Sequence, residues 1–228
     1  MPTTEEVRLE LTRRPILTEC CRRSEATGML WFGGATEVTR PPTRCVDFDH
    51  LWLAHRLLTL VDGLAHPDLA VDETPGGRRY RVRVPLPDTH TADLSPPPGA
   101  FPLPGVWAVG SSRCDARSLW RGAFLTGGRI RVTGTTIVVD VRCPDLAAVR
   151  VLRRSARRLG VRCHYDAEPG WPAVTVREPH DVRGLLEAMG AEQAFSTTRH
   201  GAATRPRQRG HATGTERCAV TPLTGRRP

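Results

Sequence analysis

Arginine recurs at every second position in several short stretches of the sequence, alternating with apolar residues. Successive side chains of a β-strand point to opposite faces, so each stretch gathers its arginines on one face. The planar guanidinium suits phosphate oxygens, a contact that positions a protein on nucleic acid without reading bases. The candidate DNA-backbone contacts are Arg79, Arg81, Arg83, Arg129, Arg131, Arg142, Arg162 and Arg177.

A second interpretation of these arginines stays open. All 33 basic residues are arginine, and any solvated sheet face of a chain without lysine would carry arginine. Binding through phosphates predicts weak affinity that falls steeply with salt. Tyr80 falls on the apolar face of its strand, so base stacking is not expected there.

Other chemistry finds little support in the residue pattern. The seven cysteines form no CxxC pair, and Cys20 and Cys21 are adjacent, which suits neither a zinc knuckle nor a redox motif. His50, His55, His66 and His90 have no acidic or cysteine partner at catalytic spacing, and no P-loop, GxSxG or GxGxxG occurs. We therefore expect no catalytic residue, no metal and no cofactor.

The net charge of +9 is unevenly distributed. Residues 199–228 hold seven arginines and one acidic residue, whereas residues 1–198 hold 26 arginines and 23 acidic residues. The 199–228 segment has almost no apolar content, so we predict a disordered basic tail. No apolar run is long enough to span a membrane and no signal peptide is evident, so we expect a cytoplasmic protein with reduced thiols, located on the nucleoid if it binds DNA.

The apolar periodicity predicts alternating helices and strands, an α+β pattern. Asp49 is the expected N-cap of the third helix. The helices are expected over about 4–14, 18–33, 50–61, 114–126, 145–159 and 181–189. The strands are expected over about 35–40, 44–48, 68–73, 79–85, 129–133, 136–142, 161–165 and 173–177.

The chain repeats itself with an offset of about 94 residues. Cys21, Gly28 and the pair Gly33-Gly34 recur as Cys114, Gly122 and Gly127-Gly128. Such a duplication predicts two helix-β-β-helix-β-β halves with pseudo-two-fold character. The predicted divisions are an N-terminal helix (1–15), a first half (16–85), a Pro-rich linker (86–112), a second half (113–198) and the tail (199–228).

Residues 26–34 and 120–128 resemble the two motif helices of LAGLIDADG homing endonucleases. The structural glycines are retained: Gly28 and Gly122 inside the helices, Gly34 and Gly128 after them. The resemblance implies two closely packed helices above antiparallel sheets that form a saddle over DNA. In the nucleases a metal-binding Asp or Glu precedes the final glycine. Gly33 and Gly127 stand there in this chain, and glycine supplies no carboxylate oxygen for a divalent metal, so nuclease activity is not expected.

A closer resemblance is to the WhiA family of sporulation and cell-division regulators, whose N-terminal part is a degenerate homing-endonuclease fold. It rests on residues 11–25, 114–125, 155–160 and 185–191 and extends over about 4–198. It implies a non-catalytic, DNA-binding transcriptional regulator of actinobacterial type.

In that family a C-terminal helix-turn-helix domain reads the DNA sequence. Residues 199–228 show no apolar periodicity for such a domain, so we expect a truncated chain without its specific reader. The alternative function is a protein-interaction module that contacts a full-length regulator, another transcription regulator or RNA polymerase without binding DNA.

Overall fold

The computed structural model describes residues 2–37, 43–85, 110–134, 136–168 and 171–196. The predicted Pro-rich linker lies outside these residues except for 110–112. The predicted tail lies outside them entirely.

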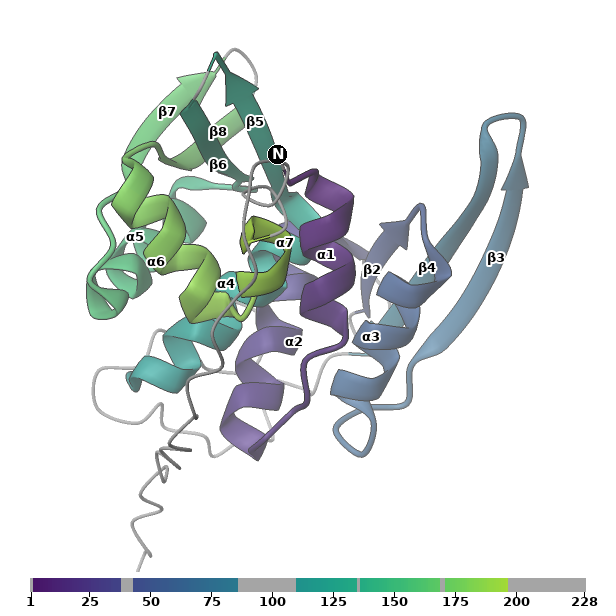
Figure 1. Ribbon diagram of the computed structural model, residues 1–228. Coiled ribbons are helices and arrows are strands. Elements are labelled where there is room, and N and C mark those ends of the chain that lie inside the picture. Colours follow the sequence, from purple (N-terminus) through teal and green to yellow (C-terminus); the bar gives the residue numbers. More distant parts are fainter. Residues whose placement is uncertain (1, 38–42, 86–109, 135, 169–170, 197–228) are drawn as a thin grey trace, which may run out of the picture.

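The described chain forms two halves of the same topology, each with a four-stranded antiparallel sheet (Figure 1). The strand orders are β1-β2-β4-β3 and β5-β6-β8-β7. The prediction of a duplicated α+β fold is therefore confirmed. The first half contains α2 (Glu19–Gly33), β1 (Gly34–Glu37), β2 (Thr43–Phe48), α3 (Leu51–Val61), β3 (Asp68–Thr74) and β4 (Gly77–Pro85). The second contains α4 (Arg113–Gly127), β5 (Gly128–Thr133), β6 (Thr136–Arg142), α5 (Leu146–Leu159), β7 (His164–Glu168), β8 (Trp171–Val176) and α6 (Pro179–Met189).

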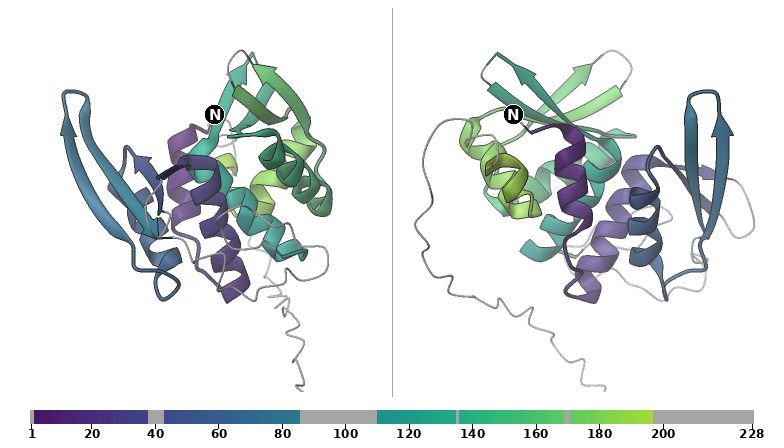
Figure 2. Two further views of the ribbon diagram at one scale, coloured as in Figure 1. Left: turned by 180° about the vertical axis from the view of Figure 1, so that it is seen from behind. Right: turned by 45° about the vertical axis from the view of Figure 1, so that its right-hand side comes forward.

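The two sheets lie on opposite sides of the central α2–α4 pair, as the views in Figure 2 show. One face of each sheet carries the buried valines and packs toward the helices. Val82 and Val84 do so in the first half, and Val139 and Val174 in the second. The other face of each sheet is open. These two open faces are the surfaces that the alternating arginines were predicted to occupy.

Helices α2 and α4 approach so closely that glycine is required at their contact. A Cβ atom on Gly28 would lie 2.6 Å from the carbonyl oxygen of Leu119. A Cβ atom on Gly122 would come closer than 3.0 Å to the carbonyl oxygen of Glu25. Backbone oxygens cannot move away as a side-chain tip can, so both positions exclude any side chain. The predicted packing role of Gly28 and Gly122 has this steric cause.

A buried carboxylate lies beside that contact. Glu25 is fully enclosed, and its carboxylate accepts two hydrogen bonds from Arg56 of α3, at 2.8 and 3.1 Å, and one from Arg121 of α4, at 3.1 Å. Arg56 also donates to the carbonyl oxygens of Thr12 and Arg14. Because a buried charge is tolerated only when it is paired and hydrogen-bonded, this group holds α2, α3 and α4 in one arrangement.

The N-terminal helix α1 (Thr4–Thr12) joins the first half to the end of the second. Its side chains Val7 and Leu11 are fully buried. The carboxylate of Glu10 accepts hydrogen bonds from the backbone N–H groups of Gln193 and Ala194, at 2.9 and 2.7 Å, at the start of α7 (Glu192–Ser196). Sequence periodicity did not predict α7, because five residues are too few to show a helical pattern.

Two local predictions were wrong. The N-cap of α3 is His50, which makes no side-chain cap hydrogen bond, and not Asp49. Strand β7 begins at His164, three residues later than predicted. The segment before β7 instead follows the end of α5, where Gly160 adopts a left-handed conformation with φ of 76°.

We predict that Gly122→Ala lowers the free energy of unfolding by about 3 kcal/mol, because the added methyl group meets the Glu25 backbone. Gly184→Ala is the matched control. Gly184 lies inside α6, and a methyl group added there would have no atom within 4 Å, so the same substitution should stabilise by about 0.5–1 kcal/mol. Urea unfolding measures both. Equal effects at the two sites would contradict the close approach of α2 and α4.

We also predict that Glu25→Gln destabilises the protein by about 3–5 kcal/mol, because it leaves the enclosed Arg56 guanidinium without its charge partner. Glu73→Gln removes the partner of Arg78 on the exposed β3–β4 hairpin and should cost at most about 1 kcal/mol. Denaturant unfolding of the two variants gives the comparison. A small loss for Glu25→Gln would show that the buried group is not a structural requirement.

Candidate nucleic-acid interface

A cavity of about 670 Å³ lies where α2 and α4 end. Its lining includes both glycine pairs, Gly33-Gly34 and Gly127-Gly128. Three arginines reach it from different elements: Arg8 from α1, Arg129 from β5 and Arg142 from β6. Within the described part of the chain, the single carboxylate in the lining is Asp140. The cavity therefore has a cationic lining at the junction of the two halves.

Arg8 is held in place by a hydrogen bond to Gly128, the residue that follows α4. Its Nη2 donates to the carbonyl oxygen of Gly128 at 2.8 Å, and burial lowers the pKa of its guanidinium. Its Nε is buried and has no hydrogen-bond partner among the described residues. The sequence pattern did not indicate Arg8, because it lies on a helix and only the strand arginines alternate with apolar residues.

Gly33 and Gly127, where the resemblance to the nucleases implies carboxylates, are required by packing. A Cβ atom on Gly33 would lie 2.6 Å from the Cβ of Thr126, and one on Gly127 would lie 2.8 Å from the carbonyl oxygen of Arg142. An aspartate therefore does not fit at either position in this arrangement. Gly34 and Gly128, which follow and were predicted as packing glycines of the motif helices, are the C-cap residues of α2 and α4.

A divalent metal of the kind used by the nucleases does not fit this cavity. The carboxylate of Asp140 is already paired with Arg129, at 3.5 Å, and with Arg131, and it accepts a hydrogen bond from Thr175 at 2.9 Å. Hard divalent cations need several oxygen ligands, and the two glycine positions supply none. A metal ion here would face arginines instead.

The open face of the first sheet carries the predicted row Arg79, Arg81 and Arg83, but each arginine has an acidic neighbour. Arg81 donates twice to Asp47, at 2.7 and 3.0 Å. The other ion pairs are longer: 3.6 Å for Arg83–Asp68 and 3.9 Å for Arg79–Asp49. The pairing of β3 with β4 also places Asp72 opposite Arg79. The row is therefore close to neutral.

The open face of the second sheet keeps more positive charge. Arg129, Arg131 and Arg142 lie on it, and Arg177 joins them directly after β8 by pairing with Asp166. Arg142 lies over the ring of Trp171, 5.2 Å from the ring centre, and forms no ion pair within the described residues. Four arginines here face two aspartates, Asp140 and Asp166.

Arg162 is not on an open face, contrary to prediction. It precedes β7, and its backbone N–H and its Nε both bind the carboxylate of Asp181 on α6, at 3.1 and 3.3 Å. It therefore belongs to the helix layer. Seven of the eight predicted arginines share the open faces, and their DNA contacts stay a prediction.

The acidic partners were missed, although the sequence held a signal for them. Asp47 and Asp140 stand between apolar residues of their strands, just as the arginines do. Alternation assigns a residue to a face, but it does not say which residues of neighbouring strands lie opposite each other. The partner of each residue is set by the register of the strands, which places Asp47 opposite Arg81 and Asp140 opposite Arg129.

Comparison with known proteins gives a matching family for part of the chain. Residues 116–205 match the family described as the WhiA LAGLIDADG-like domain. This chain contains a WhiA LAGLIDADG-like domain. The "Probable cell division protein WhiA" of Saccharopolyspora erythraea is 32% identical over 205 residues, and that of Acidothermus cellulolyticus is 33% identical over 209 residues. Each alignment covers 85% of this chain and 63% of the relative, so the chain spans less than two thirds of these WhiA proteins.

Solved structures agree with the WhiA fold. The N-terminal LAGLIDADG domain of DUF199/WhiA superposes with a TM-score of 0.65 at 17% identity, over 82% of this chain and 89% of that one. I-DmoI in complex with DNA and Ca superposes with a TM-score of 0.52 at 13% identity, over 81% of this chain and all of that one. The duplicated fold of this chain is thus similar to that of a homing endonuclease solved in complex with DNA.

No helix within the described residues is both long enough and apolar enough to cross a membrane.

We predict that Arg81 lowers the pKa of Asp47. Their hydrogen bonds stabilise the ionised carboxylate, and the charges of Arg79 and Arg83 add to the effect. Stability from this pair is therefore present above the unfolded pKa, about 3.9, and is lost as the pH falls through the lower folded value. In an NMR titration of the Asp47 carboxyl carbon, Arg81→Gln should raise the pKa.

The control for this titration is Arg78→Gln, which removes an arginine of the same strand that pairs with Glu73 instead. The Arg78→Gln substitution should leave the pKa of Asp47 at its value in the parent protein. If both variants move the titration equally, general charge on β4 controls Asp47 and the specific Arg81 pair does not.

Proposed function

We propose that this chain is a WhiA-like regulator that lies on the DNA backbone through the open faces of its sheets and does not cleave DNA. The observation that carries the proposal is the cationic cavity at the junction of the halves. Arg8, Arg129 and Arg142 approach it from three elements, and the carboxylate of Asp140 is already shared with a fourth arginine, Arg131. A DNA phosphate supplies the oxygens that these donors require.

The second sheet supplies most of the proposed affinity. Its four open-face arginines face two aspartates, whereas the three arginines of the first sheet are balanced by aspartates on the neighbouring strands. An arginine already paired with a carboxylate gains less from a phosphate, because the carboxylate repels it. The affinity for DNA should therefore fall less steeply with salt than it would with eight free arginines. Arg142 should be among the main contributors to this affinity.

The glycine positions support the proposed lack of cleavage. Gly33 and Gly127 offer no metal ligand, and both exclude a Cβ atom, so exchange of a single residue does not restore a carboxylate there. By similarity to the cell division proteins that the chain matches, we propose a role in the control of cell division and sporulation, in the cytoplasm and on the nucleoid.

A second candidate function is contact with another transcription regulator or RNA polymerase. The near-neutral open face of the first sheet favours it, since such a face attracts DNA weakly. The outer side of α3 also holds a hollow lined by Leu51, Trp52 and His55 among others, and Leu51 is exposed. Exposed apolar and aromatic side chains are typical of protein interfaces.

The test is a mobility shift on duplex DNA at 50 and 200 mM salt. Arg142→Ala should weaken binding at 50 mM roughly tenfold and reduce the salt slope by about one, because it removes one phosphate contact. Arg150→Ala is the matched control. Arg150 is exposed on α5, within the helix layer, so its removal changes the net charge equally without touching either open face.

Three outcomes would contradict the proposal. Equal weakening by the two variants would indicate attraction by net charge alone. Absence of binding at 50 mM salt would favour the protein-interaction function. Cleavage of the duplex on addition of Mg²⁺ would refute the non-catalytic part.

A further inference from the structure

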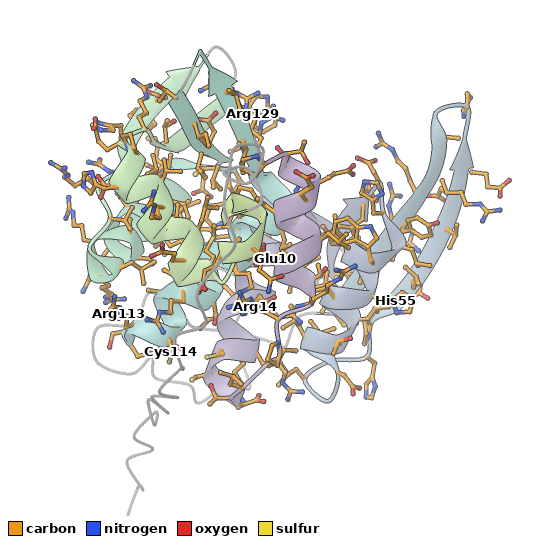
Figure 3. The ribbon with its side chains drawn as sticks, in the orientation of Figure 1. Glu10, Arg14, His55, Arg113, Cys114 and Arg129 are labelled. Carbon is orange, nitrogen blue, oxygen red and sulfur yellow. The ribbon has the colours of Figure 1, made fainter. Side chains whose placement is uncertain are left out.

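Three cysteine thiols meet at the N-terminal ends of α2 and α4. Cys20 and Cys21 lie in the first turn of α2, and Cys114 lies in the first turn of α4. Their sulfur atoms are all within 4.8 Å of one another, and the sulfurs of Cys20 and Cys114 are 3.8 Å apart. All three residues are half-buried, so small solutes can reach them. Cys114 is labelled in Figure 3, at the opposite end of the molecule from Arg129.

The duplication brings these thiols together. Cys20 and Cys114 are 94 residues apart, and so are the N-caps of their helices, Thr18 and Ser112. The glycine contact fixes the two helices side by side, which sets their first turns next to each other. The sequence repeat aligns Cys114 with Cys21 and shows no ligand spacing, because the three thiols meet only through the pairing of α2 with α4.

The spacing suits a thiophilic cation. Zinc–sulfur bonds are about 2.3 Å long, so two sulfurs on a tetrahedral zinc lie about 3.8 Å apart. The pair Cys20 and Cys114 already has this separation, and Cys21 needs a small shift to complete three ligands. Thiolates, unlike the oxygen ligands of the nuclease sites, select soft ions such as Zn²⁺ and Cu⁺.

Two features of the surroundings favour bound thiolates, whereas burial opposes them. Two helix N-termini, each with partial positive charge, point at the cluster. The hydroxyl of Thr18 is 3.1 Å from the sulfur of Cys20, and that of Ser112 is 2.9 Å from the sulfur of Cys114. The hydroxyl of Thr18 can donate to its sulfur once the thiol proton has left, whereas that of Ser112 donates to the carboxylate of Asp115, at 2.6 Å. Burial raises the pKa of Cys20 to about 11, so that thiol holds its proton until a cation displaces it.

We propose that Cys20, Cys21 and Cys114 bind one Zn²⁺ ion. Three thiols each lose a proton to solvent as three Zn–S bonds form, and no electron is transferred. Among the described residues no fourth His, Cys, Asp or Glu joins the group, so the fourth position takes a water molecule or an external ligand. This site differs from the cavity at the junction of the sheets, which lies at the other end of helices about 22 Å long.

The ion would cross-link the two halves. Cys20 and Cys21 belong to the first half and Cys114 to the second, so bound Zn²⁺ ties α2 to α4 where the glycine contact no longer holds them. A ligand that binds the folded state alone raises its stability. Zinc should therefore raise the melting temperature of the protein, independently of any binding to DNA.

The experiment uses the reduced full chain and two probes. Cd²⁺ reports thiolate ligation through its sulfur-to-metal charge-transfer absorbance, and Zn²⁺ affinity is measured by competition with a chromophoric chelator. The expected result is one ion per chain, with affinity reduced at least tenfold in Cys20→Ser and in Cys114→Ser. Cys163→Ser removes a half-buried thiol outside the cluster, and this variant should bind Zn²⁺ with the affinity of the parent protein.

A measurement without substitutions makes the test independent of variant folding. Zn²⁺ should protect Cys20, Cys21 and Cys114 of the parent chain from alkylation, as read by mass spectrometry of the peptides, and leave Cys163 as reactive as before. Equal protection of Cys163, absence of protection, or a Zn²⁺ affinity unchanged in Cys114→Ser would overturn the proposal. A preference for Cu⁺ over Zn²⁺ in competition would overturn its choice of ion.

Discussion

The close contact between α2 and α4 is the constraint on which the rest of the structure depends. Because Gly28 and Gly122 lack side chains, the backbones of the two helices touch, and each sheet is then fixed relative to the other. Contacts at both ends of the pair follow from this. At one end the paired glycines border the cationic cavity, and at the other the first turns bring three thiols together. A side chain at either central glycine would disturb both.

The net charge of each open face depends more on the acidic residues of neighbouring strands than on the number of arginines. Aspartates opposite Arg81 and Arg129 reduce the positive field where it would otherwise be strongest. They also prevent repulsion between arginines that are close on one strand. A surface of this kind retains oriented donors for a phosphate without the strong, indiscriminate attraction of an unpaired arginine row.

The sequence predicted what depends on local pattern. The duplicated α+β pattern and seven of the eight open-face arginines follow from spacing, whereas the packing glycines follow from the resemblance to LAGLIDADG helices. The remainder depends on register and on contacts across the chain. Arg162 was predicted to lie on β7, which begins after it, at His164. Asp49 was predicted to cap α3, whereas the N-cap is His50. Arg8 was not predicted, because its helix shows no arginine pattern. Cys114 meets Cys20 only after the halves pair.

The buried Glu25 shows that the two halves are no longer equivalent. Its counterpart 94 residues later is Leu119, so the second half has no carboxylate at this position. The arginines that neutralise Glu25 come from both halves, Arg56 from the first and Arg121 from the second. Two copies of the second half would bury a pair of Arg121 side chains without this acid, and two copies of the first would bury a second Glu25 without Arg121. The duplication survives in the backbone, while the interior charges distinguish the two halves.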